Sequence, residues 1–191
     1  MLVLIAGLHD TAADVRMLES MGVEGHVLPV GIAELKGELT RLEPASVDTV
    51  RIGPLSSAEA VAAMGDFLGR CAAPVVLQPE SAVEADPETA DALREVLLPR
   101  TTLVVVTAME VAALLGVPMQ DRVDMRRAGR TLAHLGARAA LLRGPAEDLL
   151  WADNRDHWRS LSSVHLRAAA ILAAGWMARG ESIFGAIEKS L

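Results

Sequence analysis

Several side chains that can bind or move charge follow short apolar runs in this sequence. The set comprises His9, Asp10, Ser56, Ser57, Gln78, Glu80, Thr107, Glu110, Arg143 and Gly144. Histidine and carboxylate groups exchange protons, arginine binds anions, and hydroxyl and amide groups orient a ligand by hydrogen bonds. If the apolar runs are parallel strands, these groups lie beyond the carboxyl ends of one sheet, where open α/β sheets bind ligands. The sequence therefore predicts a crevice in which these groups converge.

Some of these residues also fit helix caps. Ser56 or Ser57 can begin the next helix by accepting a hydrogen bond from a free backbone N–H group. Thr107 and Glu110 have the spacing of a capping box, in which each side chain bonds the other residue's backbone N–H. Both pairs therefore keep two interpretations, as ligand contacts or as caps.

The charged candidates have structural alternatives as well. Arg143 can serve as a cation in the site, or it can pair with Glu147 or Asp148. His9 follows the first strand, and a histidine in such a loop is either catalytic or simply solvated. Gln78 is neutral, so it can neither hold a metal strongly nor act as a base.

Other potential sites are not favoured by the sequence. Cys71 is the one cysteine and has only Arg70 as a neighbouring cation, so we do not expect a catalytic thiolate. The chain has no G-x-G-x-x-G, Walker, nucleophile-elbow or H-E-x-x-H motif, and we expect no metal site. The acidic stretch that begins at Glu80 is expected to face solvent. Methionines are expected to fill the core or its edge at Met64, Met109, Met119 and Met125.

The elements that would position the candidate groups alternate between strands and helices. Short apolar runs predict strands at residues 2–6, 26–30, 49–52, 75–77, 103–106 and 139–142. Helical spacing of apolar residues predicts helices at 14–21, 32–42, 57–68, 87–97, 109–115 and 124–135. A β-hairpin is predicted at 149–151 and 157–161, followed by helices at 166–178 and 182–189. This order predicts a three-layer α/β/α sandwich with a mostly parallel sheet.

Composition excludes several classes of protein. The 191 residues are 51% hydrophobic and carry a net charge of −7, which argues against disorder and against a global basic surface for nucleic acid. The longest stretch of low charge, residues 168–178, is shorter than the ~20 residues of a membrane-spanning helix. The start of the chain lacks the basic region of a signal peptide. We expect one cytoplasmic domain over residues 1–191, with no membrane or nucleic-acid partner.

Six segments follow, in order, the pattern of one enzyme family. Residues 50–59 (VRIGPLSSAE) are similar to its vKiGml.s.e, and residues 75–79 (VVLQP) to its vvlDPv. Further matches cover residues 2–25, 98–116, 128–145 and 171–189. The chain thereby resembles the hydroxymethylpyrimidine and phosphomethylpyrimidine kinases of the ribokinase superfamily. The resemblance implies a ribokinase-like fold and, in an active member, Mg·ATP as the phosphate donor.

The chain departs from that family at the positions that carry the chemistry. The family's glycine-rich GTGC or GTGD turn corresponds to residues 162–167, which include His165 and no glycine. Side chains there would keep a phosphate away from the backbone N–H groups. The first loop is short, and the flap after the second strand is missing, because Val30 and Gly31 lead directly into a helix.

Single substitutions fall in the same region. Gln78 stands for the Asp of DPv, and Thr107 for the Asn of N-x-x-E, although Glu110 is retained. The family's KGG becomes Arg143-Gly144-Pro145. We assign no catalytic residue. The strand-end rule and the resemblance together give substrate-crevice candidates His9, Asp10, Ser56 and Gln78, and nucleotide-side candidates Thr107, Glu110, Arg143, Gly144 and His165.

Three hypotheses follow. In the first, the chain has lost phosphate transfer and binds a small molecule or serves as a regulatory or assembly partner. In the second, it is an active kinase of the thiamine pathway that uses Mg·ATP with Glu110, Arg143 and His165. In the third, it is a purely structural subunit, whose alanine-rich helices at 57–68 and 166–178 pack between chains. We also expect a homodimer that covers the crevice wall left open by the missing flap.

Overall fold

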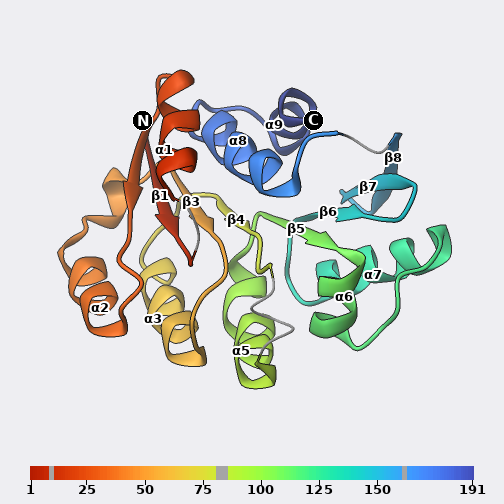
Figure 1. The fold of residues 1–191 in the computed structure, drawn as a ribbon, viewed down its shortest axis with the longest axis horizontal. Coiled ribbons are helices and arrows are strands. Elements are labelled where there is room, and N and C mark those ends of the chain that lie inside the picture. Colours follow the sequence, from red (N-terminus) through yellow and green to blue (C-terminus); the bar gives the residue numbers. More distant parts are fainter. Residues whose placement is uncertain (9–10, 81–85, 161–162) are drawn as a thin grey trace.

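An eight-stranded sheet runs through the computed structural model, which describes residues 1–8, 11–80, 86–160 and 163–191 (Figure 1). Its strands, in spatial order, are β2 (Glu24–Val27), β1 (Leu2–Ala6), β3 (Thr49–Ile52), β4 (Val75–Leu77), β5 (Leu103–Thr107), β6 (Ala139–Arg143), β7 (Glu147–Ala152) and β8 (Arg155–Ser160). The strands from β2 to β6 are parallel, and β7 and β8 are antiparallel. The predicted mostly parallel sheet is confirmed.

Helices cover both faces of the sheet, as predicted (Figure 1). One layer contains α2 (Ile32–Arg41), α3 (Ala58–Leu68), α5 (Pro87–Ala92), α6 (Ala108–Leu115) and α7 (Arg122–His134). The opposite layer contains α1 (Thr11–Ser20), α8 (Leu166–Ala178) and α9 (Ile183–Ser190). Successive strand residues face opposite sides of the sheet. Leu4 and Ala6 therefore join the core under the first layer, whereas Val3 and Ile5 join the core under the second.

Several predicted elements have different bounds in the structure, and for two of them the cause is clear. The second strand ends at Val27 instead of residue 30, because Pro29 has no N–H group with which to continue the pairing. The helix predicted over residues 87–97 is α-helical only to Ala92 and continues as a wider π-helical turn, Leu93–Leu97. Pro99, in the short 3₁₀ turn that follows, lacks the donor needed to continue a helix.

The predicted hairpin is longer than its apolar residues indicate. β7 and β8 leave only Asp153 and Asn154 between them, with φ values of 52° and 58°. Two left-handed residues form the turn that suits a two-residue hairpin, and Asp and Asn tolerate that conformation. Trp151 on β7 is buried and belongs to the core under the first layer.

One packing expectation was wrong, since Met109 does not fill the core. On α8, the alanines Ala169, Ala170, Ala173 and Ala174 are fully buried within this chain. Met109 is 69% exposed at the start of α6, although the other three methionines named above are buried. In the described part of the chain, no helix is both long and apolar enough to cross a membrane.

Candidate functional site

The carboxyl ends of the parallel strands and the first turns of α1 and α8 meet at one edge of the sheet (Figure 1). Parallel strands connected by helices all end at the same edge, so the fold itself gathers these termini. Two polar clusters lie there. One joins α1, β3, β4 and α8, and the other joins β6, β7 and the segment before α8.

The first cluster is ionic and buried. Arg51, on β3, donates from Nη2 to Oε1 of Gln78 at 2.8 Å, and the same nitrogen lies 3.7 Å from Oε1 of Glu80. Arg167, in the first turn of α8, donates to the carboxylate of Asp14 at 3.2 Å from both Nε and Nη2. These groups lie where the ends of β3 and β4 meet the first turns of α1 and α8.

Arg51 is the group in this cluster most affected by its surroundings. Burial lowers the pKa of Arg51 to about 10, and the nearby carboxylates of Asp14 and Glu80 partly offset that effect. Arg51 therefore remains a cation near pH 7, and its charge is balanced by groups that are themselves held in place. Glu80, which the strand-end rule also selects, lies beside Arg51 with a side chain that is 28% exposed, so it is not the purely solvated group that its acidic neighbours suggested.

The second cluster fixes the segment that leads into α8. Nε and Nη2 of Arg143 each donate to the buried carboxylate of Asp148 at 3.0 Å. Nη1 of Arg143 donates to the backbone oxygen of Val164 at 2.9 Å. The sequence left the partner of Arg143 open between Glu147 and Asp148. The structure assigns Asp148, while Glu147 pairs with Arg122.

Thr107 and Glu110 form the capping box that their spacing allowed. The Oγ1 of Thr107 accepts from the Glu110 backbone N–H at 3.3 Å, and the Glu110 carboxylate accepts from the Thr107 N–H at 2.5 Å. Thr107 is also the register partner of Arg143 in the adjacent strand. The two residues are therefore neighbours at the sheet edge.

Gly144 has a packing role in this structure. A Cβ atom at Gly144 would lie 2.7 Å from the sulfur of Met125, closer than carbon and sulfur can approach. Its N–H donates to the Glu147 oxygen at 3.0 Å and starts the turn between β6 and β7. Close packing against Met125 is therefore one reason for a glycine at position 144, besides the approach of a phosphate that the family resemblance implies.

The remaining predicted residues divide between three places. His165 is the N-cap of α8 and accepts a long hydrogen bond, 3.4 Å, at Nδ1 from the Arg167 N–H. Ser56 is exposed beside Leu8 and Pro54, and Ser57 caps α3. His9 and Asp10 lie outside the described residues.

Sequence reasoning missed Asp14, Arg51 and Arg167, and it named Asp148 only as one of two possible partners of Arg143. A signal existed for Arg51, since a charged residue inside a short strand that is buried on both faces must be paired. Asp14 also falls in the segment that resembles the family's aDl.tf pattern. The pairing of Arg167 with Asp14 could not be foreseen, because the two residues lie 153 positions apart.

Comparison with known proteins points to one family. The family model described as phosphomethylpyrimidine kinase matches residues 12–189. A hydroxymethylpyrimidine/phosphomethylpyrimidine kinase of Streptomyces coelicolor is 31% identical over 155 residues, which cover 72% of this chain and 57% of that protein. A kinase of the same description from Synechococcus elongatus is 30% identical over 151 residues, covering 76% of this chain and 56% of the relative. The chain thus spans a little over half the length of these two relatives.

A solved structure shows the same fold. The phosphomethylpyrimidine kinase of Clostridium difficile 630 superposes with a TM-score of 0.89, covering 99% of this chain and 96% of that one. Its sequence identity to this chain is 19%. The predicted ribokinase-like, three-layer α/β architecture is therefore confirmed.

Proposed function

This chain belongs to the phosphomethylpyrimidine kinase family, and from that premise we propose that it transfers phosphate from Mg·ATP to a hydroxymethylpyrimidine or to the phosphate ester of that alcohol. The observation that carries the proposal is the family match over residues 12–189, together with identities of 31% and 30% to two kinases of this description. This is the second of the three hypotheses above, and the family match favours it over a chain without activity.

The phosphate side of the reaction would use the start of α8. Phosphate transfer depends mainly on positioning and on stabilising negative charge. A helix N-terminus carries partial positive charge and free N–H groups, and it suits a phosphate. Arg143 supports this role, because it is a cation anchored to Asp148 that also holds the backbone of Val164 in place.

His165 would accept the proton of the alcohol. The alcohol oxygen attacks the γ-phosphorus, the bond to the bridging oxygen of ADP breaks, and the proton passes to Nδ1 of His165 and then to water. Nδ1 is the basic ring nitrogen in this arrangement, since it accepts from the Arg167 N–H. That bond is long, so replacing it by a bond from the substrate hydroxyl costs little.

Magnesium would arrive with the nucleotide. The described residues contain no group of three or more His, Cys, Asp or Glu side chains able to hold a metal ion. Mg²⁺ commonly keeps several waters and binds through phosphates and one or two carboxylates. Glu110, at the same edge of the sheet, is the carboxylate we assign to it, and the ion would neutralise phosphate charge.

The test is a phosphate-transfer assay with the purified chain, Mg·ATP and a hydroxymethylpyrimidine, followed by mass spectrometry of the products. We expect a phosphorylated pyrimidine and an equal amount of ADP. His165→Ala should lower kcat by about a hundredfold or more, as loss of a general base does. Arg143→Lys should also lower it, whereas Arg100→Lys, a matched change on the exposed turn after α5, should not. Absence of product from both the alcohol and its phosphate ester would refute the proposal.

A second candidate function is binding of the same small molecules without transfer. It is favoured by the segment before α8, where Val164 and Leu166 carry side chains and Arg143 is already engaged. In that case Mg·ATP or the pyrimidine would stabilise the fold by about 2.7 kcal/mol at a hundredfold excess over Kd, with no product formed. A thermal-shift series run beside the assay separates the two functions.

A further inference from the structure

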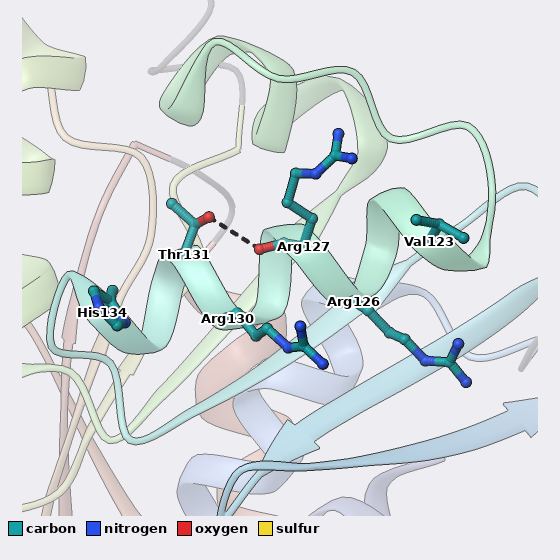
Figure 2. Close-up of a pocket in the computed structure, with 6 residues that line it drawn as sticks. All are labelled: Val123, Arg126, Arg127, Arg130, Thr131 and His134. Carbon is teal, nitrogen blue, oxygen red and sulfur yellow. Dashed lines mark hydrogen bonds between the residues drawn. The ribbon is translucent and has the colours of Figure 1, made fainter.

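The outward face of α7 is a basic surface on an acidic chain. The residues of this helix that face the core are Met125, Ala128, Gly129 and Leu132. The opposite face lines a groove of about 460 Å³, which is formed by Val123, Arg126, Arg127, Arg130, Thr131 and His134 (Figure 2). Four of the chain's 18 lysines and arginines lie on α7, although the chain as a whole has a net charge of −7. Positive charge is therefore concentrated on this helix.

Internal partners neutralise some of these cations. Arg126 donates from Nε to Asp156 at 2.8 Å, and Arg127 lies 3.4 Å from the Asp124 carboxylate. Among the described residues, Arg130 forms no ion pair, and its guanidinium lies over the ring of the buried Trp151, 5.5 Å from the centroid. The ring positions this guanidinium and leaves its charge available to a carboxylate from another molecule.

The donors of the groove have the spacing of a helix. Arg126, Arg130 and His134 follow one another at intervals of four residues, about 6 Å apart along the axis. Arg126 and Arg130 extend to one side of α7, and Arg127 extends to the other (Figure 2). Carboxylates on a second helix that are also four residues apart would meet this row in turn.

The groove also has an apolar part. Val123, in the first turn of α7, is 58% exposed and lines the same groove. A phosphate chain or a nucleic-acid backbone has no apolar group to cover this side chain, whereas a leucine of a peptide removes it from water. The lining therefore favours an amphipathic acidic occupant over a simple polyanion.

We propose that the α7 groove binds an acidic, amphipathic helical segment of another protein. Carboxylates of that segment pair with Arg127 and Arg130, and an apolar side chain packs on Val123. The rest of this chain is acidic and repels such a segment, which confines docking to the groove. The groove contains none of the residues proposed for phosphate transfer, so the interaction does not depend on that activity.

A designed peptide tests the charge complementarity. The probe is a fluorescein-labelled helical peptide with three glutamates spaced four residues apart on one face and a leucine at the end of that face. Anisotropy titration with the whole chain should show saturable binding. The same peptide with glutamine in place of each glutamate should bind at least about tenfold more weakly. Raising NaCl from about 0.1 M to about 1 M shortens the Debye length from about 10 Å to about 3 Å and should also raise the Kd.

Variants of the chain locate the binding site. Arg130→Gln should raise the Kd of the peptide about threefold to fivefold, because one exposed charge pair is lost. Arg16→Gln, the same change at an exposed position of α1 in the opposite layer, is the matched control and should leave the Kd unchanged. Val123→Ser should raise the Kd of the peptide about threefold or more, because the leucine loses its apolar contact. The same variant should leave any binding of inorganic polyphosphate unchanged.

The proposal is overturned if the peptide shows no saturable binding to the wild-type chain. It is also overturned if Arg130→Gln and Arg16→Gln have equal effects while circular dichroism shows both variants folded. Binding of polyphosphate or duplex DNA as tight as that of the peptide, with no effect of Val123→Ser, would make the groove a general anion surface and would equally refute the proposal. If a variant does not fold, the comparison of the glutamate and glutamine peptides on the wild-type chain decides.

Discussion

Arg167 and Asp14 tie the first turn of α8 to the first turn of α1, with Nε and Nη2 of Arg167 each 3.2 Å from one carboxylate oxygen. The link spans 153 positions of the chain. It also places Arg167 directly after the segment that Arg143 holds by the Val164 oxygen. The start of α8 is therefore held at two points. Arg167, on the helix itself, binds Asp14 of α1, and Arg143, at the end of β6, binds the Val164 oxygen just before the helix.

Replacing Arg167 by methionine should destabilise the fold. The change removes the cation that is hydrogen-bonded to the buried Asp14 carboxylate, and breaking such pairs costs about 3–5 kcal/mol when both partners are buried. The side chain of Arg167 is 24% exposed, so we expect about 2–4 kcal/mol from urea unfolding at pH 7. Arg16→Met, on an exposed position of α1, is the control and should change stability little. Equal effects of the two changes would contradict this account.

The elements were predictable from the sequence because their apolar runs are short and bounded. Gly53 and Pro54 end β3, and the structure gives that strand the predicted bounds, Thr49–Ile52. β2 was misplaced because its residues are polar and half-exposed, and it is recognised only through its pairing with β1. Periodicity carries no information about such an edge strand.

The candidate site was predictable only in part, because local sequence identifies residues at strand ends but not their partners on other strands. The rule for strand ends selected Gln78, Thr107 and Arg143 from local sequence, and the structure places all three at that edge. The partners that hold them are Arg51 and Asp148, each inside a strand. Which charge meets which across the sheet depends on strand register and order, and neither can be read from one segment alone.

Glycine 129 and glycine 37 should respond to alanine with opposite signs. A Cβ atom at Gly129 would lie 2.9 Å from Cβ and Cγ of the buried Trp151, so Gly129→Ala should destabilise by about 1–3 kcal/mol. Gly37, within α2, has nothing within 4 Å of that position. There the lower chain entropy of the unfolded state dominates, and Gly37→Ala should stabilise by about 0.5–1 kcal/mol. Thermal unfolding of both variants decides the sign, and destabilisation by both would be inconsistent with this packing.

Stability should fall in acid partly through Asp156. Hydrogen bonds from Arg126 and from the indole N–H of Trp158 lower the pKa of Asp156 from 3.8 to about 2. A carboxyl with a lowered folded-state pKa stabilises the fold above its unfolded value, and that contribution is lost as the pH falls through the folded value. The contribution of Asp156 is thus complete above about pH 4 and lost towards pH 2.

Urea unfolding from pH 5 to pH 2, with Asp156→Asn beside the wild type, measures this contribution. The stability difference between the two proteins should shrink steadily below about pH 4. Ser160→Ala, at the end of the same hairpin, removes no titrating group and provides the control, whose difference from wild type should not vary with pH. A difference for Asp156→Asn that does not vary with pH would show that its interactions with Arg126 and Trp158 do not persist in solution.

Glu147 and Asp148 are neighbours on β7 that should contribute very differently. Asp148 is fully buried and accepts two hydrogen bonds from Arg143, while Glu147 pairs with the largely exposed Arg122. Hydrogen bonds to buried charged groups contribute about 1.5–3 kcal/mol, and we expect a loss of that size for Asp148→Asn. Glu147→Gln should have little effect, since exposed pairs are screened by water and salt.

A double-mutant cycle with Arg143→Met then identifies the partner of Arg143. The coupling energy should be large with Asp148→Asn and near zero with Glu147→Gln, because only the first pair shares hydrogen bonds. The same variants connect stability to the site. If Arg143 holds Val164 through its anchor on Asp148, then Asp148→Asn should weaken binding of Mg·ATP in a thermal-shift series, although residue 148 lies inside the sheet. If the Asp148→Asn variant is destabilised but binds Mg·ATP as tightly as the wild type, the Arg143–Asp148 pair stabilises the fold and has no role in nucleotide binding.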